Sequence, residues 1–534
     1  METSDTQSST SPHMPPGYLL FTTLLCGCLV MVIEVLGSRV MGPVFGVSLF
    51  VWTSLITVTM VALAIGYRLG GGLVDRYQSP RVLYLLILAA GVCSLVIPWM
   101  KEPVLNASIP LGLRLGALTA ATVLFGPALL LLGCVSPFVV RLAATSMTHL
   151  GRTVGDLYAL STLGSVLGTV LTGFFLLEWA SIDRIFQIVG VLLMGCSAGY
   201  FLLQRRMGSG LALMLLAAFS TLFLPSSRRT VTLADGTQAS VIEHMESYYG
   251  RLQVVDYRFG NRAVREMEID GLIQGGMDLN NRLPVYEYHY LLQHLPRSLY
   301  PAGNRVLMIG LGAGLVPSWY VKQGLSVDAV DIDPHVVTFA RQYFQLPDAV
   351  HVYIQDARHH LATTTSAYDF LLVDVFNGDT TPHHLVSQEA FQLMAKRMTP
   401  QGVLAINLIG GVDGRDRGIN AILKTLETVF ESIVLYPLFD TNKEESGNMV
   451  VIAHKGPPRS PATLNIDPIH PMARDLVVHS LTHPTSLPRP AMNEARLLTD
   501  NDNPVDLLGL AVKESVRQSI LQHPSVARPG YGPS

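Results

Sequence analysis

The chain has 534 residues, a formal net charge of −3 at pH 7 and a mean hydropathy of +0.36. Charged residues make up only 14% of it, against roughly 25% in soluble domains. The length excludes a single small domain, and the slightly negative charge argues against a nucleic-acid-binding protein, which normally carries a basic face.

The charged residues are unevenly distributed. They are sparse between Leu19 and Leu224, whereas from Arg228 onward the composition is that of a soluble globular protein. All five cysteines lie in the apolar part, so the polar part forms no disulfide of its own. The expected division is a disordered tail at 1–17, a multi-pass transmembrane domain at 18–225, a β-rich segment at 226–300, a Rossmann-like α/β domain at 301–456 and a C-terminal extension at 457–534.

Seven apolar runs approach the length of about 20 residues that crosses a bilayer. They are Tyr18–Met41, Leu49–Leu69, Val82–Met100, Leu115–Leu142, Val154–Ala180, Ile185–Leu203 and Leu211–Leu224. We therefore expect a polytopic α-helical membrane domain of about seven helices, with six or eight as alternatives. Basic residues fall on both sides of this arrangement, so they do not define its orientation.

A carboxylate, Glu34, interrupts the first apolar run. Intramembrane carboxylates commonly mark functional sites, and the alternative is a pair with Arg39 or with a polar neighbour inside the bundle. The spacing Gly164-xxx-Gly168 and the glycine run at 70–72 favour close helix packing.

After Arg229 the sequence changes to short segments in which apolar and polar residues alternate. Turn signals at 235–236 (Asp-Gly), 260–261 (Gly-Asn) and 270–271 (Asp-Gly) predict a lead-in of two or three β-hairpins. The following segment at 304–344 predicts a strand, a glycine turn, a helix, a second strand and a second helix. This pattern opens a doubly wound α/β sheet.

The glycine turn indicates the class of cofactor. It contains Gly310, Gly312 and Gly314. A dinucleotide fingerprint needs a small residue at its third position, where this sequence has Leu315. The turn therefore favours an adenosyl-sulfonium cofactor, which has no phosphate but needs a carboxylate for its ribose hydroxyls. Asp331, which ends the second strand, is the expected carboxylate, and Asp333 is the alternative.

Two further strands also end in aspartates, at Asp356-Ala357 and at Asp374. In open α/β sheets ligands bind beyond the carboxyl ends of the strands. We therefore expect Asp331, Asp356 and Asp374 to form one site, although any one of them could instead cap a helix.

These stretches resemble, in the same order, the spermidine synthase family of polyamine aminopropyltransferases. The resemblance covers about half of the chain, from near Thr230 to near Lys455. It is carried by the segment Glu246–Asp278 and by IGLGAG, VDID, QDAR and YDFLLVD. The hydrophobic part resembles the membrane extension of some bacterial members, in EVLGSRVMGPVFGVSLFVWTSLI and ALAIGYRLGGGLVDR.

The resemblance implies transfer of an aminopropyl group from decarboxylated S-adenosylmethionine to a diamine such as putrescine, which leaves methylthioadenosine. It makes Asp331 the ribose ligand, Asp356 and Ala357 the adenine-contacting pair, and Asp374 the catalytic base. A carboxylate at this position can hold an ammonium group and accept its proton. The donor carries its own leaving group, so no metal is expected, and the histidine pairs at 359–360 and 383–384 lack the usual ligand spacing.

On the substrate side, the resemblance implies roles for Gln274, Tyr288 and His289. It also implies one for Asn377, which stands in place of a family aspartate, and for Ala313. The family has an aspartate at the Ala313 position, which holds the ammonium of the donor and repels the carboxylate of intact S-adenosylmethionine.

Other departures concern the acceptor site. Tyr290 replaces a family glutamate and Gly250 a family glutamine. In LLTDNDNPVDLL, Asp500 and Asp502 either line the acceptor pocket or cap a turn before a helix. Two alternative functions therefore stay open, an S-adenosylmethionine-dependent methyltransferase and a non-catalytic membrane protein that senses polyamines or assists their transport.

The resemblance also implies a location. We expect an integral protein of the bacterial inner (plasma) membrane with its catalytic domain in the cytoplasm, where the donor is made. The expected partner is a small-molecule diamine, and a homo-oligomer is left open because soluble family members are commonly dimers or tetramers.

Overall fold

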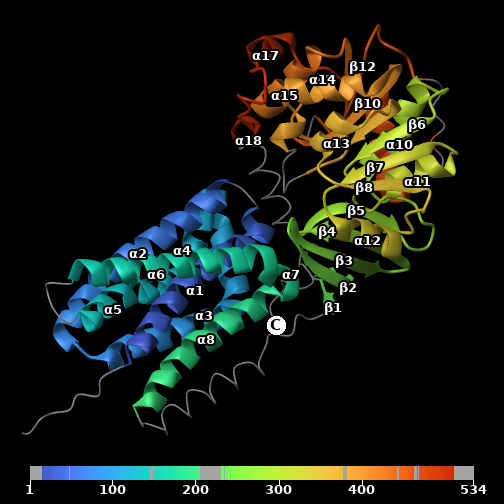
Figure 1. Ribbon diagram of the computed structural model, residues 1–534. Helices are drawn as coiled ribbons and strands as arrows, with labels where there is room; N and C mark the ends of the chain where they lie inside the picture. The colour runs from blue at the N-terminus through green and yellow to red at the C-terminus, as the bar shows by residue number, and fades with distance from the viewer. Residues whose placement is uncertain are drawn as a thin grey trace, which may run out of the picture. The chain divides into compact units, whose positions relative to one another are not determined.

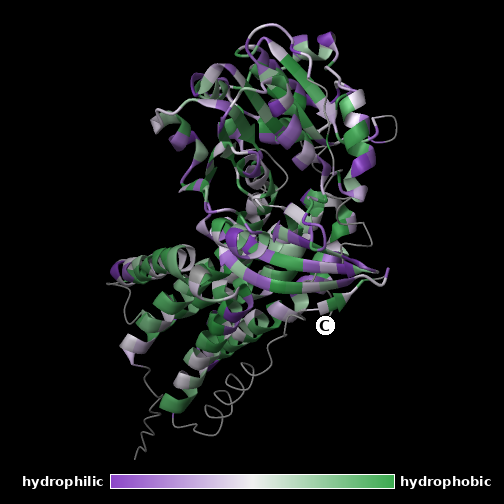
Figure 2. Cartoon of the chain, turned by 90° about the vertical axis from the view of Figure 1, so that its right-hand side faces the viewer, coloured by the Kyte–Doolittle hydropathy of each residue, from purple (hydrophilic) through white to green (hydrophobic). Residues whose placement is uncertain are grey.

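The computed structural model describes residues 15–509, with gaps at 47–48, 145–149, 205–229, 234, 377–381, 442–443, 445, 462–465 and 467. The described residues divide into two compact units, one ending at residue 204 and the other beginning at residue 230 (Figure 1). Hydrophobic residues predominate on the helices of the first unit, whereas the second unit mixes both kinds of residue (Figure 2).

The first unit is helical. Its helices are α1 (Pro16–Phe45), α2 (Leu49–Tyr77), α3 (Pro80–Ser108), α4 (Gly112–Gly133), α5 (Val135–Ala143), α6 (Leu150–Leu171), α7 (Leu177–Trp179) and α8 (Ile182–Leu203). Among the described residues, five helical stretches are long and apolar enough to cross a membrane, and one of them, 80–143, comprises α3 to α5. Six of the expected apolar runs coincide with helices. The run at 211–224 lies outside the described residues, so the count of seven stays a prediction.

Helices α1 and α6 approach each other through glycines. A Cβ atom at Gly164 would lie 2.1 Å from the carbonyl oxygen of Leu24, and one at Gly168 would lie 2.2 Å from that of Cys28. Neither position has room for a side chain. The packing role predicted for this glycine pair is therefore confirmed.

The glycine run at 70–72 and the carboxylate of Glu34 each make one described contact within the bundle. In the run at 70–72 only Gly70 makes a close contact, because a Cβ there would lie 2.7 Å from the Cα of Cys134. Glu34 is hydrogen-bonded to the hydroxyl of Thr59 on α2. Its partner is thus a polar neighbour within the bundle, the alternative that the sequence left open.

The second unit begins with an antiparallel meander in the order β1-β2-β3-β4-β5. The strands are β1 (Thr230–Thr232), β2 (Gln238–Ser247), β3 (Gly250–Phe259), β4 (Arg262–Ile269) and β5 (Leu272–Asp278). The three predicted turns each join two of these strands. At the turn between β4 and β5, Asp270 and Gly271 have φ angles of 48° and 72°, the left-handed pair that a two-residue hairpin requires.

A seven-stranded sheet follows, in the order β11-β12-β10-β9-β6-β7-β8. Its strands are β6 (Arg305–Ile309), β7 (Ser326–Asp331), β8 (Val350–Ile354), β9 (Tyr368–Val373), β10 (Met398–Gly410), β11 (Ser432–Pro437) and β12 (Gly447–His454). Only β12 runs antiparallel to its neighbours. The predicted α/β sheet is therefore present, with its strand order reversing beside β6.

Helices cover both faces of this sheet (Figure 1). They are α10 (Glu287–Leu299), α11 (Leu315–Lys322), α12 (Pro334–Phe344), α13 (Ala357–Thr363), α14 (Gln388–Lys396), α15 (Arg417–Glu427), α16 (Pro471–Thr482), α17 (Arg489–Glu494) and α18 (Val505–Leu508). On β6, Val306 and Met308 join the core beneath α10 to α12, whereas Leu307 and Ile309 join the core beneath α13 to α15. Burial on both faces explains why these strands are almost continuously apolar.

The glycine contact between α1 and α6 predicts a specific loss of stability. Gly164→Ala should lower the free energy of unfolding by about 1–3 kcal/mol, because the added methyl group overpacks the contact. Gly155→Ala is the matched control on the same helix, where a Cβ would meet no atom within 4 Å. Thermal unfolding of the full-length protein in detergent measures both, and equal melting temperatures would contradict the role of the contact.

Candidate functional site

The glycine turn between β6 and α11 is built from residues in left-handed conformations. Gly310, Gly312 and Gly314 have φ angles of 83°, 51° and 72°. A Cβ at Gly310 would lie 2.1 Å from the carbonyl oxygen of Asp374, and one at Gly312 would lie 2.5 Å from that of Gln274. The absence of side chains thus lets the turn lie directly against the end of β9 and against β5.

Asp331 lies beside this turn, at the end of β7. Its carboxylate accepts hydrogen bonds of 2.9 Å from the backbone N–H groups of Leu311 and Asp333. Burial raises the pKa of Asp331 to about 6, although these two donors oppose the shift. Asp333 is buried and caps α12 through His335, while its other oxygen accepts from Ser247. Of the two predicted carboxylates, Asp331 therefore lies beside the glycine turn, whereas that of Asp333 is used by α12 and Ser247.

Asp356 lies at the same edge of the sheet and caps α13. One of its oxygens accepts a 2.9 Å hydrogen bond from the backbone N–H of His359, and the other lies 3.3 Å from Nε2 of His384. The helix-cap alternative is thus present in the structure. Ala357, the first residue of α13, is half-buried next to it.

A tyrosine that the sequence patterns did not indicate lies near these aspartates. Burial, and then the charges of Asp333, Asp331 and Asp356, raise the pKa of Tyr249, which is in the two-residue turn between β2 and β3. The neighbouring Gly250 has a φ of 146°, and a Cβ there would lie 2.7 Å from a side-chain oxygen of Asp270. The fold therefore requires glycine at residue 250, where the sequence departs from the family glutamine.

Asp374 follows β9 and lines a pocket of about 250 Å³ together with Gln274, Tyr288, Gly312 and Asn407. Asn407 donates a 2.9 Å hydrogen bond from Nδ2 to Oδ1 of Asp374. Burial raises the pKa of Asp374 to about 6, and the hydrogen bond from Asn407 opposes that shift. The pocket thus holds a carboxylate that is ionised at neutral pH and poorly solvated.

Asn407 is a functional candidate that the sequence reasoning missed. It lies on β10, which pairs with β9. Its Oδ1 is buried without a hydrogen-bond partner, so an acceptor atom is left free beside the carboxylate. The available signal was a lone amide within the apolar strand VLAINLIG.

The tyrosine–histidine pair begins α10. The rings of Tyr288 and His289 stack with centroids 4.1 Å apart. Nδ1 of His289 donates to the carbonyl oxygen of Tyr286 at 3.2 Å, because a carbonyl can only accept, and Nε2 therefore carries the lone pair. Burial lowers the pKa of His289 to about 4. A Cβ on Gly275 would lie 3.4 Å from this Nε2 and 2.8 Å from Cβ of Ala313, so the neutral ring and the buried alanine both lie next to Gly275.

Tyr290, at the position of the family glutamate, is not among the described residues that line this pocket. Tyr290 donates to the carbonyl oxygen of Pro284 and accepts from the backbone N–H of His470. Its hydroxyl is thus used in internal packing away from Asp374. Asn377 lies outside the described residues.

The two aspartates near the C-terminus do not line the pocket around Asp374. Asp502 forms a turn with Thr499 and pairs with Arg496 at 2.5 Å. Asp500 pairs with Arg358 at 2.6 Å. Both residues thus lie in the turn closed by Thr499 and Asp502, and neither is among the described residues that line this pocket.

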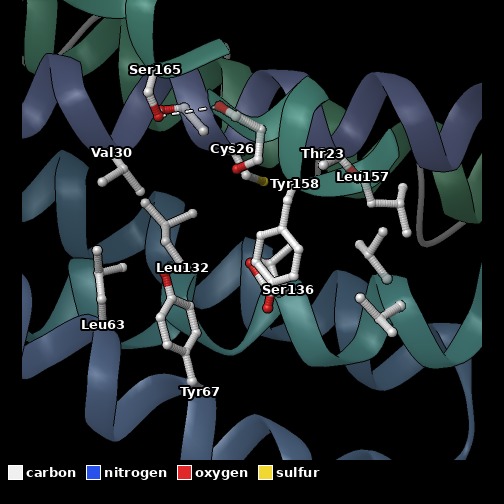
Figure 3. Close-up of a pocket in the computed structure, with 15 residues that line it drawn as sticks. Thr23, Cys26, Val30, Leu63, Tyr67, Leu132, Ser136, Leu157, Tyr158 and Ser165 are labelled. Atoms are coloured by element: carbon white, nitrogen blue, oxygen red, sulfur yellow. Dashed lines mark hydrogen bonds between the residues drawn. The ribbon is translucent and has the colours of Figure 1, made fainter. Parts of the chain in front are cut away.

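The helical unit contains a pocket of its own, of about 90 Å³, among α1, α2, α4, α5 and α6 (Figure 3). Hydroxyl groups of Thr23, Ser136, Tyr158 and Ser165 surround it, and its described lining includes no charged side chain. Within the described ranges, no group of three or more His, Cys, Asp or Glu side chains could hold a metal ion. Of these two pockets, only that of Asp374 is lined by a carboxylate within the described residues.

The strand order, the glycine turn and the aspartates at one sheet edge define a methyltransferase-like α/β domain. Residues 286–455 match the family model of the spermine/spermidine synthase domain. Over these residues the chain is similar to the spermidine synthase family.

Individual relatives differ in their activities. An N-terminal histidine N-methyltransferase of Emericella nidulans is 27% identical over 256 residues, which cover 42% of this chain and 45% of that protein. A polyamine aminopropyltransferase of Vibrio vulnificus is 28% identical over 219 residues, covering 39% of this chain and 71% of that protein. The crystal structure of a probable spermidine synthase from Corynebacterium glutamicum is 18% identical with a TM-score of 0.39, and covers 49% of this chain and 96% of that one. The chain thus spans less than half the length of the Emericella nidulans relative.

The contact between Gly310 and Asp374 predicts that the turn tolerates no side chain. Gly310→Ala should destabilise the protein by more than about 2 kcal/mol, because a left-handed alanine is strained and its methyl group would collide with the backbone. Gly236→Ala isolates the strain, since Gly236 has a φ of 84° and no atom within 4 Å of an added Cβ. If thermal unfolding shows equal losses for both variants, the collision contributes nothing.

Proposed function

We propose that the chain is a polyamine aminopropyltransferase, which transfers an aminopropyl group from decarboxylated S-adenosylmethionine to a diamine such as putrescine. The observation that carries the proposal is the half-buried Asp374 with its Asn407 donor, in a pocket beside the glycine turn of a spermine/spermidine synthase domain. A buried carboxylate of this kind suits an acceptor that arrives as an ammonium ion and must lose a proton.

The donor would bind along the sheet edge. The side-chain-free turn allows close approach of an adenosyl group, and Asp331 would accept hydrogen bonds from its ribose hydroxyls. Asp356 and Ala357 would contact the adenine, with Tyr249 near the same edge. The sulfonium of the donor activates the neighbouring carbon and leaves as the neutral thioether methylthioadenosine.

The acceptor would bind in the pocket of Asp374. This carboxylate first accepts a proton from the ammonium group, which frees the nitrogen lone pair. The nitrogen then forms a bond to the activated carbon while the carbon–sulfur bond breaks and its electron pair stays on sulfur. The free Oδ1 of Asn407 would orient the amine by accepting one of its N–H groups. Gln274, Tyr288, His289 and Asn377 would complete the substrate side.

Methyl transfer from intact S-adenosylmethionine is the second candidate, and two observations favour it. Ala313 leaves the position beside His289 without a carboxylate that could hold the ammonium of the decarboxylated donor. One relative is named an N-terminal histidine N-methyltransferase. The same base could deprotonate an amine for either reaction, so only the donor distinguishes them.

We also propose that the apolar helices anchor the protein in a bacterial inner membrane. Their length and composition support insertion. The catalytic unit would face the cytoplasm, where its donor is made.

Donor choice and catalysis can be tested together with the purified full-length protein. We expect methylthioadenosine to form from the decarboxylated donor and putrescine, and Asp374→Asn to lower kcat by roughly 10²–10⁴-fold through loss of the base. Donor affinity, measured by calorimetry, should stay within a few fold. Methyl transfer from intact S-adenosylmethionine, with no product from the decarboxylated donor, would replace the first candidate by the second.

The hydrogen bond from Asn407 predicts a shift in pH dependence. Since the base works ionised, kcat/KM of the unaltered enzyme should fall below about pH 6, the pKa of Asp374. Asn407→Leu removes a donor that stabilises the charged form, so the acidic limb should move to higher pH. Asn448→Leu is the control, because Asn448 lines the pocket without a described hydrogen bond to Asp374. An unshifted limb in the Asn407 variant would show that another group titrates.

A further inference from the structure

The C-terminal segment lies beyond the spermine/spermidine synthase match yet contacts the surroundings of Asp356. The carboxylate of Asp500 accepts a 2.6 Å hydrogen bond from Nη2 of Arg358 and a 2.5 Å hydrogen bond from Oγ of Ser387. Arg358 is on α13, which Asp356 caps, and Ser387 is the buried cap of α14. One carboxylate thus joins the starts of two helices.

The guanidinium of Arg358 extends this connection into the loop before α14. Its Nη1 donates to the carbonyl oxygen of His384 at 2.8 Å and to Oγ of Ser387 at 3.1 Å. The ring of His384 in turn places Nε2 at 3.3 Å from Asp356. A continuous chain of polar contacts therefore runs from Asp500 through Arg358 and His384 to Asp356.

Other contacts tie the same two segments together independently of Arg358. Asn503 donates from Nδ2 to the carbonyl oxygen of His383 at 2.8 Å. The backbone N–H of Gln388 donates to the carbonyl oxygen of Leu498 at 2.8 Å. Removal of the Asp500 carboxylate should thus leave the segment docked and release only the arginine.

We propose that Asp500 is a positioning residue, which holds Arg358 and thereby the His384 loop and Asp356 in the geometry that binds the adenosyl part of the donor. The inference rests on the proposed function, because it takes the edge at Asp356 as the adenine site. The side chain of Arg358 is only 21% exposed. Without its carboxylate partner it is a half-buried cation, free to turn toward solvent and abandon His384.

The test compares two aspartates of the same turn in the full-length protein. Asp500→Asn should weaken methylthioadenosine binding about tenfold, since it replaces a charge-assisted pair by a weaker one. The KM for the donor should rise by the same factor while kcat changes little. Asp502→Asn removes a pair with Arg496 that does not touch the His384 loop, and it should bind methylthioadenosine as the unaltered protein does.

Three results separate the possibilities. If the unaltered protein binds neither methylthioadenosine nor either donor, the proposed function fails. If it binds and Asp500→Asn binds equally well, the positioning role is wrong. Arg358→Lys supplies the second variant should Asp500→Asn be unstable. Arg358→Lys should weaken methylthioadenosine binding by the same factor as Asp500→Asn. The variant that carries both substitutions should bind no more weakly than either single variant, because both act through one contact. Additive losses would overturn the proposal.

Discussion

The architecture of the site depends on the backbone contact between Gly310 and the carbonyl oxygen of Asp374. It fixes the end of β9 against the glycine turn, and Gly312 does the same for Gln274 on β5. A carboxylate, a cofactor-type turn and the edge of the small meander are thus brought to one place by glycines alone. A side chain at Gly310 or Gly312 would force these groups apart, so the geometry of the site and the packing of the fold both require glycine there.

The electrostatics of the site balance two opposing effects. Removal of a carboxylate from water raises its pKa, whereas N–H donors from Leu311 and Asn407 stabilise the charged form of Asp331 and Asp374. The net pKa of each is about 6. Each group is therefore ionised at neutral pH but has a stronger affinity for a proton than an exposed aspartate, which for Asp374 suits the role of base proposed for it.

The sequence predicts the features that depend on local rules. The glycine turn, the strand-end aspartates and the Asp-Gly hairpin follow from residues adjacent in the chain. Asn407 and Asp500 act across 33 and 142 residues, and neither partner can be identified before strand order and loop docking are known. Tyr290 shows the same limit, because its hydrogen bonds to Pro284 and His470, which the sequence does not reveal, decide the direction of its hydroxyl.

The position of His289 and Ala313, both beside Gly275, has a consequence for the donor choice proposed for this site. A neutral imidazole nitrogen acts only at hydrogen-bond range, whereas a carboxylate attracts or repels ions over a distance that salt shortens. Under the proposed function, discrimination between donors at this point would be steric and directional, and insensitive to ionic strength. Under the proposed function, a carboxylate gained or lost at residue 313 would add or remove a long-range charge effect on the donor.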